Sequence, residues 1–346
     1  MKILVSQDWE NTVENHAGVS YQCKKMTLLY PDIFTHISVP RAEPVSCFLF
    51  LGRFISSRIN WMIRRHNQNK IIYSTITEIE KIVHKGDELF LMEYFDVSLD
   101  YLTVAKIIRK KHPDMIIYGL SHLVPEKLDK SYSDNRLMEW KAPINYILTL
   151  GHSLTDYYVS RGFNRNEIKT TFDPVDDYYI ENDTKLNETF TVIVMGNQMR
   201  DEKTLLRVVE HNQDVKFKIC QGMRDFSKIF TTKNVELIPF VEEDVLREHM
   251  LSSDVSLNIM KDTIGSTVIV TSIGMGLAMI CTDVGSIHDY CNNDNTIFCN
   301  NLDDYSEAIK KLKNDKELLL RMKRASIKKA KELTTKVYCD LIIKMT

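Results

Sequence analysis

The sequence lacks the features that mark secreted, zinc-binding, membrane-spanning and nucleic-acid-binding proteins. Its 7 cysteines are scattered over 346 residues and never form a C-x-x-C pair, so we expect reduced thiols and no metal site. The longest apolar candidate, Cys47–Ile63, is interrupted by Arg53 and Arg58, which predicts that no segment spans a membrane. The formal net charge of -2 gives no basic excess for a nucleic-acid partner.

The beginning of the chain also lacks the pattern of a secretory signal. The stretch MKILVSQDW turns polar after one short apolar run and has no small-residue cleavage site. We therefore expect a cytoplasmic protein. A single core rarely grows beyond about 250–300 residues, so a chain of 346 residues predicts two domains.

Short apolar runs alternate with segments of helical period, which is typical of βα units around a parallel sheet. In the first half the predicted strands are Lys2–Val5, His36–Val39, Leu89–Met92, Met115–Gly119 and Tyr146–Leu150. In the second half they are Phe190–Met195, Val215–Cys220, Val235–Ile238, Val255–Ile259, Ala278–Cys281 and Thr296–Phe298. The predicted helices include Thr103–Lys111, Ser153–Gly162, Lys203–Glu210, Asp244–Leu251, Ser266–Met275 and Asp303–Lys313.

Between the two halves, the polar segment Glu181–Glu188 has no periodicity and indicates a linker. We predict an α/β protein with two Rossmann-like domains, whose parallel sheets face a central cleft. The expected domains are residues 1–182 and 183–330, with a C-terminal helix at 331–346 packing back toward the first domain. Ligands of such sheets bind at the carboxyl ends of the strands, so the loops that follow strands are the candidate sites.

The loop Asp262–Thr267 leaves a predicted buried strand and enters a helix. Gly265 allows the backbone to approach a ligand, and Ser266 and Thr267 can cap the helix or donate to an anion. The unpaired N–H groups and the positive end of the helix dipole favour a diphosphate there. A helix cap without a ligand explains the same residues, and this loop alone does not separate the two.

The segment Gly276–Ser286, GLAMICTDVGS, resembles the G-L-P-V-I-A-T-D-V-G-G stretch of glycosyltransferase family 4, with Ala278 where proline is usual. Other segments resemble those of the same family in the correct order: upstream Val235–Val241, Asp244–Leu251 and Ser253–Ile259, and downstream Thr296–Cys299, Leu302–Leu312 and Asn314–Met322. The resemblance covers nearly all of the second half of the chain.

This resemblance implies a GT-B fold and retaining transfer of a sugar from a UDP- or GDP-sugar to a glycan or lipid-linked glycan acceptor. It also implies that neither a metal nor a cofactor is needed. Residues 1–182 would then bind the acceptor and residues 183–330 the nucleotide-sugar. The expected context is surface polysaccharide biosynthesis in the cytoplasm, at the inner face of the membrane.

Gly196–Lys203 resembles the family's G-R-l…K-G turn, in which an arginine and a lysine hold the donor diphosphate. Lys203 falls on the lysine, Asn197 replaces the arginine, and Arg200 could supply the missing charge. A cation there would stabilise the negative charge that develops on the leaving diphosphate. The alternative is a solvated charged turn that opens a helix.

The chain departs from the family at its E-x7-E pair, whose positions are taken by Thr263 and Thr271. We place the donor ribose near Thr271, although a hydroxyl cannot accept two donors as a carboxylate does. Three alternatives therefore stay open: a catalytically silent homologue acting as an assembly partner, a sugar-nucleotide epimerase and a phosphorylase of the same fold.

The first half carries weaker similarities. Gly18 lies where the family has a glycine-rich loop over the donor, and His122 resembles the histidine beside the transferred sugar. Glu93 and His152, which also lie near strand ends, are candidates for acceptor binding. A lone histidine such as His122 equally suits a structural role.

One predicted helix suggests contact with a lipid surface. Phe48, Leu51, Ile55, Ile59 and Met62 follow i, i+3, i+4 spacing, and arginines lie on the other side. An interfacial helix touching anionic lipid and a lipid-linked acceptor fits this pattern. A helix that packs on its own sheet fits it as well.

Overall fold

The structure, a computed structural model, describes residues 1–8, 16, 18–40, 53–96 and 100–345, and for residues 53–56 only the backbone. These residues divide into two compact units. The N-terminal unit contains the described residues up to 170, except His16 and residues 150–154. The C-terminal unit contains those exceptions and residues 171–345. Each unit has its own six-stranded sheet.

The sheet of the N-terminal unit has the strand order β2-β1-β3-β4-β5-β6, and β2, β1, β3, β4 and β5 pair in parallel. Its strands are β1 (Lys2–Gln7), β2 (Phe34–Val39), β3 (Glu88–Leu91), β4 (Ile116–Ser121), β5 (Tyr146–Leu150) and β6 (Ile168–Thr171). The helices along this part of the chain are α1 (Val19–Leu29), α2 (Arg53–Ile82), α3 (Tyr101–Lys111), α4 (Pro125–Ser131), α5 (Asp134–Lys141) and α6 (His152–Ser160).

Burial of the central strands holds this sheet together. Ile3, Leu4 and Val5 of β1 are fully buried, as expected for a strand covered on both faces. The helices begin and end at polar signals: Asp100 caps α3 by accepting from the backbone N–H of Thr103 at 3.1 Å. At the other end of α3, Arg109 donates to the carbonyl of Met115 at 2.7 Å.

The sheet of the C-terminal unit has the order β12-β11-β10-β7-β8-β9 and is parallel throughout. Its strands are β7 (Thr191–Val194), β8 (Lys216–Cys220), β9 (Val235–Ile238), β10 (Val255–Asn258), β11 (Ala278–Thr282) and β12 (Thr296–Cys299). The helices are α7 (Glu202–His211), α8 (Glu243–Leu251), α9 (Thr267–Gly274), α10 (Ile287–Tyr290), α11 (Leu302–Asn314), α12 (Lys316–Ala330) and α13 (Thr335–Lys344).

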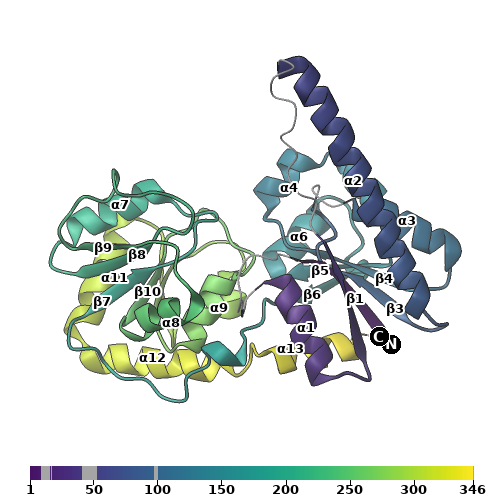
Figure 1. Ribbon diagram of the computed structural model, residues 1–346. Helices are drawn as coiled ribbons and strands as arrows, with labels where there is room; N and C mark the ends of the chain where they lie inside the picture. Colours follow the sequence, from purple (N-terminus) through teal and green to yellow (C-terminus); the bar gives the residue numbers. More distant parts are fainter. Residues whose placement is uncertain (9–15, 17, 41–52, 97–99, 346) are drawn as a thin grey trace. The chain divides into compact units, whose positions relative to one another are not determined.

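Two hydrophobic cores lie on the two faces of this second sheet. Residues of α7 and α11 pack on one face, around Phe217 and Ile309. Residues of α8, α9 and α10 pack on the other, around Ile273 and Tyr290. Figure 1 shows this layered order, with α11 and α12 in yellow and α8 and α9 in green. A doubly wound α/β sheet is therefore covered on both faces.

In both sheets the chain order reverses beside the first strand of the unit. β1 lies between β2 and β3, and β7 lies between β8 and β10. At such a switch point the connections leave in opposite directions, so a crevice forms outside the carboxyl ends of the two central strands. The loops after β1 and β3, and those after β7 and β10, are therefore the places to look for ligand binding.

All eleven strands predicted from apolar runs are present, and the fold class of two Rossmann-like units with parallel sheets is confirmed. The sixth strand of the first sheet, β6, was not predicted because Ile168–Thr171 is short and half polar. The helix α1 was not predicted either. Among the described residues no helix is long and apolar enough to cross a bilayer.

The observed division of the chain differs from the expected boundary at residue 182. Residues 171–182 belong to the C-terminal unit, because Val175 bonds to the carbonyl of Leu333 at 2.8 Å and Tyr179 is buried in its core. The predicted linker is also held by this unit, since Asn187 donates to the carbonyl of Ser253 at 3.0 Å. The C-terminal helix α13 groups with the same unit.

Candidate functional site

The loops that follow β7 and β10 are bonded to each other at the switch point of the second sheet. The N–H of Asp201 donates to the carbonyl of Ile259 at 2.9 Å, and the N–H of Lys261 donates to the carbonyl of Met199 at 2.8 Å. Met199 takes a left-handed backbone with φ 56° to make this turn. Arg200, between the two bonds, is therefore fixed at the carboxyl edge of the sheet.

The side chain of Arg200 is buried without a partner. Only 8% of the residue is exposed, and neither terminal guanidinium nitrogen has a hydrogen-bond partner among the described residues. The guanidinium lies over the ring of Phe226, 5.6 Å from its centroid. Burial lowers the pKa of Arg200 to about 10, so the group stays charged at neutral pH. A buried cation with free donors is costly to the protein unless an anion binds it.

The residues around Arg200 do not neutralise its charge. Arg224 lies over the same Phe226 ring and pairs with Glu202 in the first turn of α7, so that carboxylate already has a cation. Lys203, also in the first turn of α7, is exposed. The side-chain amide of Asn197 donates to the carbonyl of Gln221 at 2.8 Å, and its buried oxygen has no partner among the described residues. Two cations of this turn, Arg200 and Lys203, can therefore bind a diphosphate together.

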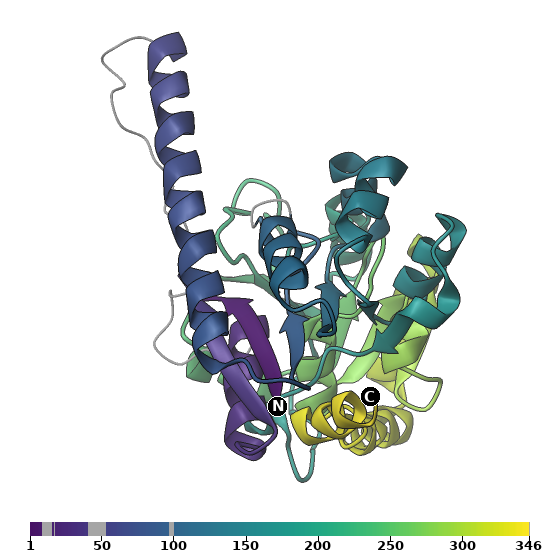
Figure 2. The same cartoon turned by 90° about the vertical axis from the view of Figure 1, so that its right-hand side faces the viewer.

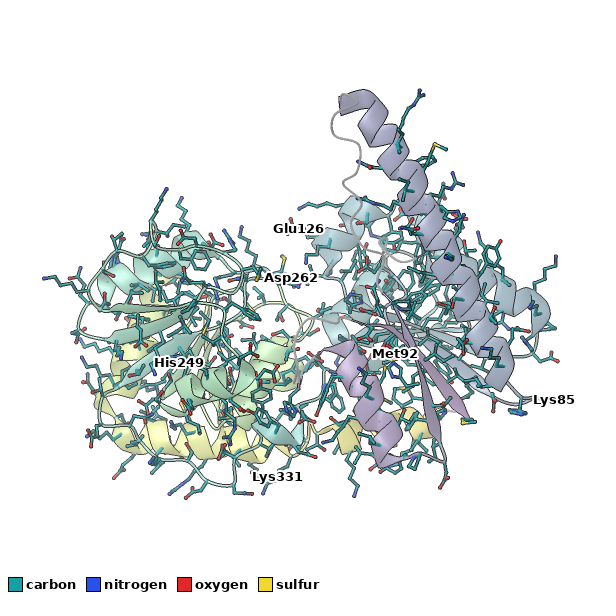
Figure 3. The ribbon with its side chains drawn as sticks, viewed as in Figure 1. Lys85, Met92, Glu126, His249, Asp262 and Lys331 are labelled. Atoms are coloured by element: carbon teal, nitrogen blue, oxygen red, sulfur yellow. The ribbon has the colours of Figure 1, made fainter. Side chains whose placement is uncertain are left out.

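The second predicted loop forms the N-terminus of α9. The hydroxyl of Ser266 accepts from the N–H of Ile269 at 3.3 Å and so caps the helix. Gly265 has φ 103°, and a Cβ added there would lie 2.2 Å from the ring of Tyr290. Packing against Tyr290 therefore requires the glycine already, whether or not a ligand approaches. Thr267 begins α9, and Figure 3 labels Asp262 in the loop before it.

Both threonines at the positions of the family's glutamates use their hydroxyls locally. Thr271 is buried and donates to the carbonyl of Thr267 at 2.7 Å. Thr263 is also buried, and its hydroxyl accepts from the N–H of Gly265 at 3.1 Å. Thr271 can still accept a hydrogen bond from a ribose hydroxyl, but it cannot hold two donors.

At the switch point of the first sheet, Glu93 is bonded to the carboxyl end of β1. It follows Met92, which Figure 3 labels, and only 2% of it is exposed. One of its carboxylate oxygens accepts from the backbone N–H of Gln7 at 2.7 Å. This bond gives the buried carboxylate of Glu93 a structural contact at the end of β1.

A cavity of about 30 Å³ lies beside this switch point. Side chains from the ends of β1 and β2 and from α2 and α3 line it, namely Gln7, Val39, Pro40, Gln68, Ile71, Ile72, Thr75, Asp100, Tyr101 and Val104. The hydroxyl of Tyr101 is buried and has no partner among the described residues. A cavity of this volume has room for one or two water molecules and is far smaller than the roughly 300–1,000 Å³ of a small-molecule site.

His122 lies at the carboxyl end of β4, as expected from the sequence. Its Nδ1 is buried and has no partner among the described residues, and its Nε2 lies 3.9 Å from the carboxylate of Asp96. Burial lowers the pKa of His122, more strongly than Asp96 raises it. The ring is therefore neutral at pH 7 and can exchange hydrogen bonds with a sugar hydroxyl.

We expect His122 to make the protein less stable at acid pH. Because its folded-state pKa is depressed, the unfolded chain takes up this proton first as pH falls below about 6.5. The stabilisation present above that pH is then lost. Urea unfolding between pH 7 and pH 5 gives the free energy of unfolding of the wild type and of His122→Gln. When plotted against pH, the two free energies should converge as pH falls. Parallel curves would show that His122 titrates normally.

His152 and Gly18 are placed at helix starts. The backbone N–H and ring Nδ1 of His152 both bond to the carboxylate of Asp289, at 2.6 Å and 2.7 Å. This pairing ties the start of α6 within the C-terminal unit and gives His152 a structural role. Gly18 precedes α1 with φ 87°, and a Cβ there would meet no atom of the described residues within 4 Å.

Two contributors to these sites carried no sequence signal. Phe226 lies beneath the guanidinium of Arg200 from the loop after β8, and Tyr101 lines the cavity from the first residue of α3. Each sits far along the chain from the residues it serves, and only the folded sheet brings them together. No cluster of three metal-binding side chains occurs among the described residues.

The two sheets, with a switch point in each, define a protein of the GT-B fold class, and comparison with solved structures agrees. Sucrose-phosphate synthase from Thermosynechococcus elongatus superposes with a TM-score of 0.75 at 10% identity, over 99% of this chain and 97% of that one. HepE from Anabaena, in complex with UDP, gives 0.72 at 10% identity over 99% of each chain. A glycosyltransferase from Rickettsia africae gives 0.67 at 9% identity, over 99% and 97%.

Comparison of the amino-acid sequence with known families and curated proteins finds no match. At identities of about a tenth, what the solved structures share with this chain is the fold. The function therefore has to be argued from the site.

Proposed function

We propose that this protein is a glycosyltransferase that binds the diphosphate of a nucleotide-sugar at Arg200 and transfers the sugar to an acceptor hydroxyl. The observation that carries the proposal is the buried, unpartnered guanidinium at the switch point of the second sheet. A doubly charged diphosphate offers the bidentate acceptor that such a group needs. Lys203 in the same turn and the N-terminus of α9 would add to the positive potential.

In this reaction the bond between the anomeric carbon and the phosphate oxygen breaks, and its electron pair leaves with the diphosphate. The acceptor oxygen forms the new bond, and its proton passes to the departing phosphate. Arg200 would stabilise the charge that grows on the leaving group. The resemblance to glycosyltransferase family 4 supports retention without a metal, and HepE, which binds UDP, favours a uridine nucleotide.

The acceptor would bind the N-terminal unit. His122, whose buried Nδ1 has no partner among the described residues, is the candidate contact for the transferred sugar. A glycan or a lipid-linked glycan of a surface polysaccharide pathway fits the resemblance.

One observation favours a second candidate, a catalytically silent homologue that acts as an assembly partner. Both glutamate positions of the family pattern hold threonines whose hydroxyls are engaged with the protein's own backbone. Such a protein would show no detectable affinity for a panel of nucleotide-sugar donors and would release no UDP from UDP-sugars. An epimerase of the same fold would instead interconvert its nucleotide-sugar without an acceptor, and a phosphorylase would transfer a sugar from a glycan to inorganic phosphate.

Thermal unfolding with UDP, GDP and inorganic diphosphate tests the diphosphate site. A ligand at 100 times its dissociation constant stabilises a protein by about 2.7 kcal/mol. For Lys203→Ala we expect the dissociation constant of UDP to rise about tenfold, as for loss of one charge-assisted hydrogen bond. At the same UDP concentration about half of the stabilisation should then remain.

Lys316→Ala serves as the matched control, because Lys316 is also an exposed lysine in the first turn of a helix. It should bind UDP as the wild type does. If none of the three ligands raises the melting temperature of the wild type, the proposed diphosphate site is wrong.

A further inference from the structure

The N-terminal half of α2 extends beyond the other helices and strands of its unit (Figures 1 and 2). Arg58, Trp61, Met62 and Arg65 follow i, i+3, i+4, i+7 spacing and so share one face of this helix. All four are exposed, with 58% of Trp61 and 63% of Met62 accessible to solvent. We call these four residues the Trp61 face.

The Trp61 face takes no part in the core of the unit. From residue 57 onward, where burial is described, the buried residues of α2, Ile72, Thr75, Ile76 and Ile79, all lie in its C-terminal half. The guanidinium of Arg65 lies over the ring of Trp61, 5.3 Å from its centroid. Two large apolar side chains thus stand in solvent between two arginines, and the packing of the described residues does not require them there.

The charge of this part of the chain is of one sign only. Residues 53–77 contain Arg53, Arg58, Arg64, Arg65 and Lys70 and no Asp or Glu, whereas the whole chain has a formal net charge of -2. The first acidic residue on α2 is Glu78. A surface that is positive and apolar at once is complementary to an anionic bilayer, which offers phosphates to the arginines and an apolar boundary to tryptophan.

We propose that the Trp61 face docks this protein on an anionic membrane surface. α2 would lie at the headgroup level, with Trp61 and Met62 reaching the acyl boundary and Arg58 and Arg65 binding lipid phosphates. A second copy of the chain suits this face less well, because it would bring like charges together. Nucleic acid would pair with the arginines and leave Met62 exposed. Together with the proposed glycosyl transfer, docking gives access to a lipid-linked acceptor.

Sedimentation of the full chain with lipid vesicles tests the docking. We expect binding to vesicles of phosphatidylcholine with 30% phosphatidylglycerol, weakening as salt rises, and little binding to phosphatidylcholine alone. Each basic residue near an anionic surface contributes about fivefold in affinity, so Arg58→Gln with Arg65→Gln should weaken binding about 25-fold. High salt screens the arginines and leaves the apolar contact with the bilayer. The double variant Trp61→Ser with Met62→Ser should therefore lose the vesicle binding that the wild type keeps at high salt.

The double variant of Arg321→Gln and Arg324→Gln is the matched control. It removes the same charge from two exposed arginines on α12 and should bind vesicles as the wild type does. Trp61 should also show a blue-shifted emission on anionic vesicles, measured as the difference between the wild type and Trp61→Phe.

Three results would overturn the proposal: no binding to anionic vesicles, equal binding to neutral ones, or full binding by the Arg58 and Arg65 variant. A lipid-independent dimer that the Trp61 and Met62 substitutions dissociate would instead make the face a self-association surface. Stabilisation by UDP should be the same in all these variants. The membrane proposal and the diphosphate proposal can therefore fail independently.

Discussion

Replacing Arg200 with methionine should weaken binding of UDP strongly and, at the same time, raise the melting temperature of the ligand-free protein. Truncating one partner of a buried charge pair costs about 2–5 kcal/mol, which is a loss of roughly 30-fold to several thousandfold in affinity. Without ligand, the guanidinium is a buried charge whose terminal nitrogens have no partner. Methionine removes that cost and still packs on the ring of Phe226.

Arg224→Met provides the comparison for this variant. Arg224 lies over the same ring, but it is partly exposed and already paired with Glu202. Its loss should change UDP affinity little and should not stabilise the protein. Calorimetric titration gives the affinities, and scanning calorimetry gives the melting temperatures. A ligand-free protein destabilised by Arg200→Met would mean that the guanidinium supports the fold, contrary to the site we propose.

The second large effect is expected at Gly265. Alanine there would place its Cβ 2.2 Å from the ring of Tyr290, in a backbone with φ 103°. Tyr290 cannot move freely, because its hydroxyl accepts from the N–H of Asp173 at 2.9 Å. Overpacking costs about 1–3 kcal/mol and the left-handed backbone about 1–2 kcal/mol more. We therefore expect Gly265→Ala to lower the free energy of unfolding by about 2–5 kcal/mol even without nucleotide.

The variant Gly18→Ala separates the cost of overpacking from the cost of the left-handed backbone. Gly18 also has a positive φ, of 87°, but among the described residues a Cβ there meets no atom within 4 Å. It should show the backbone cost alone, so urea unfolding should find it clearly the milder change. If Gly265→Ala unfolds like the wild type and loses only UDP binding, the glycine serves the ligand instead of the packing against Tyr290.

The fold could be predicted because burial on both faces of a parallel sheet leaves continuous apolar runs in the sequence. The runs Val255–Ile259 and Ala278–Cys281, for example, became β10 and β11 within a residue at their ends. β6 has no such run, since Ile168 and Thr171 alone are buried in it. The helix α1 begins at Gly18 without a side-chain cap, so the usual start signal is missing.

The site could be predicted only in part. Arg200 and Lys203 stand together in one turn, so their charges could be assigned to a ligand from the sequence. The burial of Arg200 depends on Phe226, which reaches it from the loop after another strand. For Gly265 and Glu93 the structure adds local contacts that the sequence could not indicate: the glycine makes room for Tyr290, and the carboxylate of Glu93 accepts a hydrogen bond from the N–H of Gln7.

The paired backbone bonds between the loops after β7 and β10 have a consequence for how a nucleotide would bind. Asp201 and Lys261 are tied to the neighbouring loop through main-chain groups alone, so the turn holds its shape without any ligand contact. A preorganised receptor loses little conformational entropy on association. A nucleotide should therefore bind at this edge without a conformational change of the turn, and stopped-flow experiments should show a single fast phase.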